Sequence, residues 1–148
     1  MASNSRLAIA IHTVGVLAFV GERSVTSTII AQSVNTNPVV IRRIIGSLVK
    51  HGIVEVQMGT GGGSRLTRAP EKITLADIYL ALEEGEVFDV PILEDSPCPI
   101  GQTVRPVLRK VLGEAENALL QQLGRVSLAN VMGMIAKKLP KDFCGGPN

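Results

Sequence analysis

Arg42, Arg43 and Lys50 fall on one side of a predicted helix in the segment NPVVIRRIIGSLVKHG, which begins at residue 37. At 100° per residue, the same narrow arc also contains Val39 and Gly46. A helix face that only meets solvent usually carries charges of both signs, whereas this arc carries no anion. Arginine and lysine bind phosphate oxygens, and a glycine removes bulk where a partner backbone would approach. The arc therefore predicts a nucleic-acid recognition helix.

The ends and the opposite face of this helix are also specified locally. Asn37 can cap free backbone N–H groups, Pro38 suits the first turn, and Gly52 suits the position after the last turn. We therefore expect a helix over residues 38–51. Its other face is an apolar stripe that can be buried, made of Ile41, Ile44, Ile45 and Leu48.

The neighbouring segments complete a helix-turn-helix with a wing. Thr26 can cap a short helix, STIIAQSV, that ends at Asn35. After the recognition helix, residues 53–57 and 64–68 predict two short strands, and the glycine-rich stretch 58–63 predicts the tip between them. In this arrangement the second helix enters the major groove of DNA. The expected fold is mainly α with a small β-hairpin wing, a winged helix-turn-helix.

Alternation along the hairpin assigns its two faces. Leu66 should point inward with Val54 and Val56, which turns Arg65 and Thr67 outward. Arg65 is then the wing residue best suited to a phosphate or minor-groove contact. The glycines do not predict a nucleotide-binding loop, because a strand follows them instead of a helix N-terminus and because no Lys-Ser/Thr pair is present.

The predicted DNA contacts come from the start of the first helix of the motif, from the recognition helix and from the wing. They are Thr26, Asn37, Val39, Val40, Arg42, Arg43, Lys50, Thr60, Gly61, Gly62 and Arg65. Each charged member could also be an ordinary solvated side chain, so the set is a hypothesis about this surface.

Charge and aromatic content narrow the class of nucleic acid. Residues 1–76 carry eight Lys or Arg and three Glu, whereas the remainder carries seven Lys or Arg and ten Asp or Glu. A basic half beside an acidic half is typical of a nucleic-acid reader with a separate partner or sensing region. With three Phe, one Tyr and no Trp, the sequence lacks the stacking platforms that bind RNA or single strands. Double-stranded DNA is the expected partner.

The second half predicts an oligomerisation arm. Thr74 and Asp77 can cap a helix that closes the DNA-binding domain, assigned to residues 1–84. An acidic, proline-bearing connector follows over residues 85–102. A long helix over residues 103–123 then carries an apolar stripe at three-to-four spacing.

A partner subunit would cover this stripe, which makes a homodimer the expected state. The predicted seam consists of Val104, Leu108, Val111, Ala115 and Leu119. Pro106 is acceptable in the first turn of the helix or kinks it further along. Ser127 can cap a last helix, so residues 103–140 are assigned to dimerisation and residues 141–148 to a tail.

The two cysteines, Cys98 and Cys144, lie far apart and form no metal-spaced pair. Cys98 could be a thiol sensor, because it precedes a helix N-terminus that can lower a thiol pKa. It could equally be a small packed residue, and the lack of a nearby resolving cysteine favours that interpretation. The apolar stretch from Leu7 to Val20 is too short to span a bilayer. We expect a cytoplasmic protein without a membrane partner.

Four segments resemble the Rrf2 family of bacterial winged-helix transcription regulators, which includes the iron–sulphur regulator IscR. They are IAQSVNTNPVVIRRI, GTGGGSRL, ITLADIYLALE and the CPIG that precedes the long helix. The resemblance covers nearly the whole chain and is nearest to the YwnA-like branch. It implies a homodimer crossed through the long helix, bound to a pseudo-palindromic operator and usually repressing transcription.

The sequence departs from the family pattern at three places. Cluster-binding members carry three closely spaced cysteines in the connector, whereas this sequence has only Cys98 there. The resemblance therefore implies DNA binding without an iron–sulphur cluster, and we expect no cofactor and no metal. A frequent Tyr after the wing glycines is Ser64 here, and an Arg that some members place before them is Met58. The wing should then read fewer base edges.

Two other function classes compete with a DNA-binding regulator. A winged-helix module could dimerise and bind protein without binding DNA, although the arc of Arg42, Arg43 and Lys50 argues against it. An enzyme could use Cys98 with His12 or His51, but no orienting Asp or Asn and no oxyanion loop accompany them. The chain is therefore not expected to be an enzyme.

Overall fold

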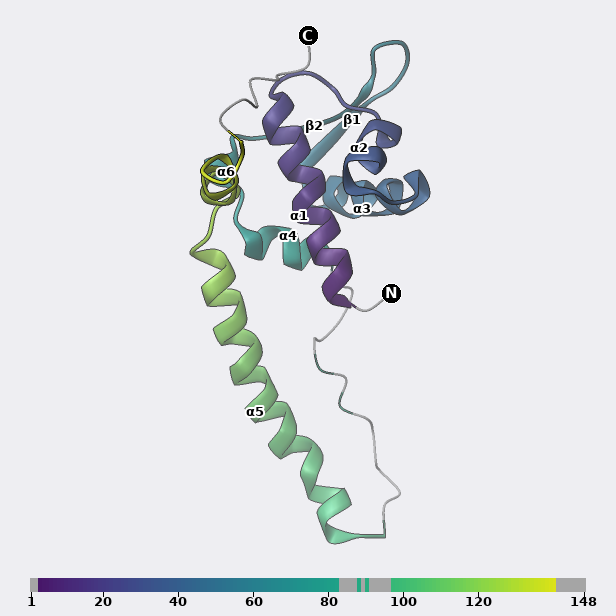
Figure 1. Ribbon diagram of the computed structural model, residues 1–148. Coiled ribbons are helices and arrows are strands. Elements are labelled where there is room, and N and C mark those ends of the chain that lie inside the picture. The colour runs from purple at the N-terminus through teal and green to yellow at the C-terminus, as the bar shows by residue number, and fades with distance from the viewer. Residues whose placement is uncertain (1–2, 83–87, 89, 91–96, 141–148) are drawn as a thin grey trace.

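The computed structural model describes residues 3–82, 88, 90 and 97–140. Its helices are α1 (Ser3–Val20), α2 (Ser27–Val34), α3 (Pro38–Lys50), the short 3-10 helix η1 (Pro70–Lys72), α4 (Leu75–Leu82), α5 (Pro99–Gly124) and α6 (Leu128–Ala136). Its strands are β1 (Val54–Gln57) and β2 (Gly63–Leu66). Figure 1 shows a body made of the other elements, from which α5 extends as a long rod. Apart from η1, which the sequence does not predict, the order of elements is the predicted one.

The core of the body forms around α1. This helix contacts α2, α3, α4, α6 and β2, and Figure 1 shows it passing between α6 on one side and α2 and α3 on the other. The apolar stripe of α3 is buried as predicted, with Ile41, Ile44, Ile45 and Leu48 at most 5% exposed. The other largest fully buried side chains include Val14, Leu17, Ile30, Ile53, Ile73, Ile78 and Leu128.

The wing is an antiparallel pair in which Val54 lies opposite Leu66 and Val56 opposite Ser64. Val54 is buried, but Val56 is 47% exposed, so the prediction that it points into the core is wrong. It shares a face of the hairpin with Val54, but it lines the open groove between α3 and the wing. Ser64 is buried because its backbone exchanges two hydrogen bonds with Val25, of 2.9 and 2.8 Å. These bonds fix the base of the wing to the loop before α2.

The capping box predicted for α4 is present. The backbone N–H of Thr74 donates to Asp77 Oδ2 at 2.8 Å, and the N–H of Asp77 donates to Thr74 Oγ1 at 3.1 Å. The long helix α5 starts at Pro99, earlier than expected, so Pro106 lies inside it. Proline has no N–H for the preceding turn, and α5 therefore lacks one backbone hydrogen bond there.

The segment assigned to dimerisation divides into two parts in the structure. No described residue of α5 is buried, whereas α6 returns to pack on α1 and η1 and buries Leu128 completely. The N–H of Leu128 donates to Ile73 O at 2.7 Å, and the N–H of Leu75 donates to Val126 O at 2.9 Å. The helix α6 is thus part of the body, and α5 alone forms the arm. None of the helices in the described part of the chain is long and apolar enough to cross a membrane.

Candidate DNA interface

The helix α3 is held in place by the caps that the sequence predicts. Asn37 Oδ1 accepts a hydrogen bond of 2.8 Å from the N–H of Val39, and Pro38 occupies the first turn. After the helix, Gly52 adopts a left-handed conformation with φ of 67°, which a glycine reaches without steric cost. Because the opposite stripe of the helix is buried, the face that carries Arg42, Arg43 and Lys50 points outward.

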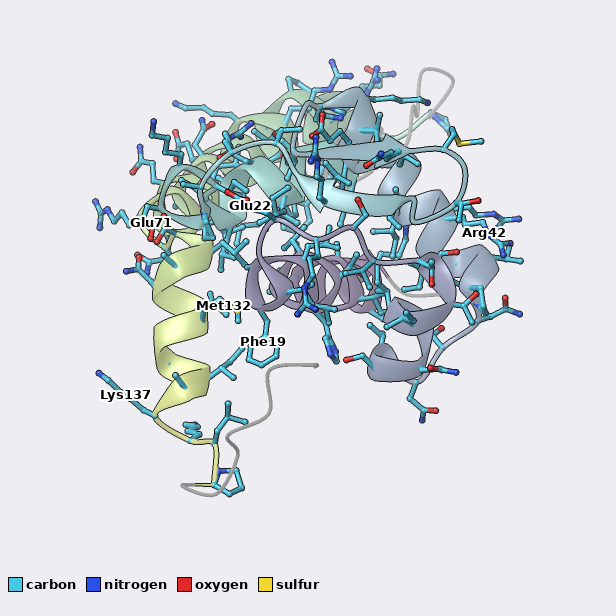
Figure 2. All side chains as sticks on the ribbon, turned by 90° about the horizontal axis from the view of Figure 1, so that it is seen from above. Phe19, Glu22, Arg42, Glu71, Met132 and Lys137 are labelled. Carbon is cyan, nitrogen blue, oxygen red and sulfur yellow. The ribbon has the colours of Figure 1, made fainter. Side chains whose placement is uncertain are left out.

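The cationic arc consists of Val39, Arg42, Arg43, Gly46 and Lys50, and all five are exposed. None of its three cations forms an ion pair with another described residue. Val39 is 46% exposed at the start of the helix. In Figure 2, Arg42 lies at the outer edge of the molecule. The arc therefore presents cations and little bulk to a partner.

A concave groove of about 640 Å³ separates α3 from the wing. It brings Thr26, Arg42 and Gly62 together, which are three of the predicted DNA contacts. Gly46 also lines it, and a Cβ built there would have no atom within 4 Å. Neither packing nor backbone conformation requires this glycine, so its position on the outer face is free for a close approach.

The first turn of α2 borders the same groove. Thr26 Oγ1 accepts a 3.4 Å hydrogen bond from the N–H of Ile29, which confirms the predicted cap. The remaining N–H groups of a helix N-terminus attract phosphate oxygens. Thr26 and Ser27 line the groove at this end.

The wing contributes less positive charge than its sequence suggests. Arg65 lies directly opposite Glu55, and its Nε is 2.5 Å from Glu55 Oε1. Both side chains are about half exposed, so Glu55 neutralises the charge of Arg65 on the solvent face of the hairpin. Thr60 and Gly61 are exposed at the tip. The expected phosphate contact by Arg65 must therefore compete with Glu55.

Three other residues near the predicted interface, Val40, Gly62 and Arg68, contribute to the packing or the shape of the body and the wing. Val40 is half-buried against the core, which makes its side chain the least accessible of the predicted contacts. A Cβ at Gly62 would lie 2.2 Å from Gln57 O, so the turn itself requires that glycine. Arg68 donates to Lys72 O at 3.0 Å and to Gly52 O at 3.1 Å, which ties the base of the wing to η1.

Ten residues that line the groove are absent from the predicted set. Among them are Ser27, Val49, Gln57 and Met58. Val49 follows Arg42 by seven positions, a helical spacing that could have identified it. Met58 is 87% exposed at the edge of the tip, and only the fold of the hairpin brings it to the groove.

The predicted dimer seam is accessible along the arm. Leu108, Val111, Ala115 and Leu119 are exposed, and Val104 is half-buried. Val107 and Ile100, which were not in the predicted seam, are also exposed. The arm thus presents a continuous series of apolar side chains.

Cys98 lies at the cap position of α5 and is exposed, so it is not a packed hinge residue. The backbone N–H groups of Gly101 and Ile100 lower the pKa of its thiol from the ordinary value of 9.0. The two histidines contact other groups: His12 Nε2 lies 3.1 Å from Ser33 Oγ, and His51 Nδ1 lies 3.0 Å from Ser47 O.

The comparisons with known proteins agree with this geometry. A family model named Rrf2 and described as an iron-dependent transcriptional regulator matches residues 3–134. YwnA of Bacillus subtilis (strain 168), named as a candidate HTH-type transcriptional regulator, is 37% identical over 130 residues, which cover 87% of this chain and 96% of that protein. Protein rrf2 of Nitratidesulfovibrio vulgaris is 32% identical over 123 residues, covering 83% of this chain and 80% of that protein.

The description of the family raises the question of iron. Among the described residues, no group of three or more His, Cys, Asp or Glu side chains could hold a metal ion. Protein iron–sulphur clusters require several thiolate or imidazole ligands, whereas Cys98 stands at the cap of α5 with Pro97 and Pro99 as its neighbours. The described donor set does not fit an iron site, and the predicted absence of a cluster stays a prediction.

Solved structures share the same architecture. A crystal structure of a candidate DNA-binding protein is 32% identical, with a TM-score of 0.66, and the match covers 86% of this chain and 98% of that one. The structure of T. potens IscR is 22% identical, with a TM-score of 0.65 over 96% of this chain and 91% of that one, and it supports the fold alone. The order of elements, the matched family model and the relatives lead to one conclusion: the chain belongs to the Rrf2 family of transcriptional regulators.

Proposed function

We propose that the chain is a homodimeric repressor that acts in the cytoplasm on double-stranded DNA and binds a pseudo-palindromic operator through α3 and the wing. The observation that carries the proposal is the cationic arc of α3. Its three cations are exposed and form no ion pair with another described residue. Uncompensated cations on one helix face suit the phosphates and base edges of the major groove.

The groove beside α3 suggests how the two kinds of contact are divided. Arg42 lines the groove together with the start of α2 and the wing, so it is the residue we assign to a base edge. An arginine reads guanine through two hydrogen bonds to O6 and N7. Arg43 and Lys50 are the proposed phosphate contacts, which fix the position of the helix without reading sequence.

The homodimer is proposed from the arm. A helix of 26 residues without a buried side chain has apolar surface that a second copy would cover. Two-fold symmetry would place two α3 helices about 34 Å apart, in successive major grooves on one side of the duplex. Repression is proposed because regulators that this chain resembles usually repress.

The test compares two double variants of matched charge. Arg42→Ala with Arg43→Ala removes two cations from the arc, and Lys137→Ala with Lys138→Ala removes two adjacent exposed cations after α6. Figure 2 shows Lys137 on the opposite side of the molecule from Arg42. Fluorescence anisotropy with a labelled random duplex would measure affinity over a range of salt concentrations.

We expect the arc variant to lose at least about tenfold in affinity at low salt, with the log–log salt slope reduced by about 0.9 for each phosphate contact removed. The control variant should retain the parental affinity and slope. Equal binding by both variants would assign the contact to another surface. No binding by the parent protein at low salt would instead favour a winged-helix module that binds protein.

A further inference from the structure

A second groove, of about 640 Å³, lies on the side of the body away from α3, between α1 and α6. Its walls are apolar: Ile11, Val16 and Phe19 come from α1, and Met132 and Ile135 come from α6. In Figure 2, Phe19 and Met132 lie between these two helices. Phe19 and Ile135 are exposed at the rim, so the groove opens to solvent. Its volume is in the range of about 300–1,000 Å³ that small-molecule sites occupy.

Gly15 forms part of this groove without a structural reason to be glycine. It lies in the middle of α1, where a glycine costs about 1 kcal/mol relative to alanine. Its backbone does not adopt a positive φ, and a Cβ built there would meet only Met132 Sδ, at an ordinary contact distance of 3.6 Å. The fold tolerates a side chain at this position, yet none is present. The missing side chain keeps the groove deep between α1 and α6.

The polar groups of the groove are confined to one place. His12 on α1 and Ser33 on α2 both line it, and a hydrogen bond of 3.1 Å joins His12 Nε2 to Ser33 Oγ. The residues that line the groove include no carboxylate. A concave apolar surface with one small polar cluster is the usual design of a ligand site, because the polar groups orient a mainly apolar molecule.

We propose that this groove binds a small apolar molecule that carries one hydrogen-bond-accepting head group, such as a medium-chain carboxylate. The apolar body lies over Gly15 and Met132, and the head group contacts His12 and Ser33. The absence of a lining carboxylate favours an anionic head over a cationic one. The concave shape and volume suit a small molecule better than the flat surface of a protein partner.

The position of the groove also suggests a regulatory role. Ser33 belongs to α2, the first helix of the DNA-binding motif, and α6 follows directly after the arm α5. A ligand between α1, α2 and α6 would therefore change how α2 and α3 sit relative to the arm. This consequence rests on the proposed function, whereas binding in the groove does not.

The first experiment measures binding alone. The dye 1-anilinonaphthalene-8-sulfonate has an apolar body and an anionic head, and its fluorescence reports transfer into an apolar site. We expect saturable binding of one dye per chain to the full-length protein and displacement of the dye by decanoate. Decanol, which lacks the charge, should displace it at least about tenfold less well.

Two matched glycine variants locate the site. Gly15→Leu fills the groove and should weaken dye binding at least tenfold. Gly133→Leu adds the same side chain to α6 at a position where a Cβ meets nothing within 4 Å, and Gly133 is not among the groove residues. It should bind as the parent protein does. Thermal melting shows whether each variant is folded.

A third variant keeps the test decisive if Gly15→Leu does not fold. Ile135→Asp changes an exposed rim residue and adds a carboxylate, so it should fold and reject decanoate more strongly than decanol. His12→Ala should reduce the preference for decanoate over decanol.

Decanoate should also change the DNA affinity of the parent protein and leave that of Gly15→Leu unchanged. If binding is present but DNA affinity does not respond, the regulatory role is wrong and the site remains.

Four results would overturn the site itself. Dye binding that does not saturate, or that is unchanged in a folded Gly15→Leu or Ile135→Asp variant, would exclude the groove. Binding that appears only after the arm is disrupted would assign the groove to a second copy of the chain. Binding that appears only in a chain ending at Pro140 would assign it to residues 141–148.

Discussion

Glu55 neutralises part of the positive charge that the wing would offer to DNA under the proposed function. Its carboxylate pairs with Arg65 on the opposite strand, and an exposed pair of this kind contributes only about 0.2–1 kcal/mol to stability. Glu55→Gln should therefore leave the fold intact and release Arg65. We expect tighter binding to duplex DNA and a salt slope that is steeper by about 0.9, because one more phosphate contact forms.

Glu71→Gln is the matched control for this prediction, since it removes an exposed carboxylate from η1. Figure 2 places Glu71 across the molecule from Arg42. Anisotropy titrations should show the change in slope only for Glu55→Gln. An identical slope in both variants would mean that the wing makes no phosphate contact through Arg65.

The thiol of Cys98 should ionise more readily than an ordinary cysteine. The N–H groups of Gly101 and Ile100 stabilise the thiolate and lower its pKa from 9.0, so the thiolate forms at a lower pH than in an unfolded chain. In a Cys144→Ser variant, the rate of alkylation by iodoacetamide should reach half its maximum below pH 9.0. Urea-unfolded protein is the control. A midpoint in the folded protein at or above that of the unfolded protein would contradict this.

Gly46 is an exposed position of α3 at which an added methyl group should change both the stability of the helix and its approach to DNA. A Cβ there meets no protein atom within 4 Å, so Gly46→Ala should stabilise the helix by about 1 kcal/mol through helix propensity alone. The same methyl group lies on the face proposed to enter DNA. We therefore expect a higher melting temperature together with at least about fivefold weaker DNA binding, measured by calorimetry and anisotropy.

Gly133→Ala in α6 separates the two effects, since a Cβ there is equally unobstructed. It should raise the melting temperature by a similar amount and leave DNA binding unchanged. If Gly46→Ala binds DNA as well as Gly133→Ala does, the backbone of α3 does not approach DNA at this point.

Elements whose ends depend on nearby residues could be predicted from the sequence. Thr26, Asn37, Thr74 and Ser127 all cap helices as expected, because a cap needs only atoms within three residues. The buried stripe of α3 follows from helical spacing in the same way. The arc of Arg42, Arg43 and Lys50 is exposed as expected for the same reason.

Features that depend on distant contacts could not be predicted. The pairing of Glu55 with Arg65 requires the strand register, and the burial of Ser64 requires the bridge to Val25. The return of α6 to α1 depends on hydrogen bonds between residues 73–75 and 126–128. The groove between α1 and α6 could not be predicted for this reason, although a glycine in the middle of a helix, Gly15, was a local signal of a close approach there.

The proposed homodimer depends on the arm, because α5 would bring two copies of α3 together on DNA. Leu108→Glu with Leu119→Glu places charges on the exposed stripe of α5, and an unpaired charge buried in an interface is costly. Light scattering should report a monomer for this variant and a dimer for the parent protein. Specific DNA affinity should fall at least about a hundredfold, because only one half-site is then bound by each chain.

The control for the arm replaces exposed polar residues of the same helix, Gln121→Glu with Asn117→Glu. It adds the same charge at positions outside the proposed seam and should remain dimeric. A dimer in both variants would place the subunit contact on another surface.

Selection of bound fragments from a random duplex library tests directly whether the chain reads DNA as a symmetric dimer. We expect enrichment of one site made of two inverted half-sites, with centres about one helical turn apart. Arg42→Ala should relax the preference at one base pair in each half-site, by about 1–3 kcal/mol. The absence of any enriched sequence, or an enriched site without two-fold symmetry that is unchanged by Arg42→Ala, would contradict the proposed function.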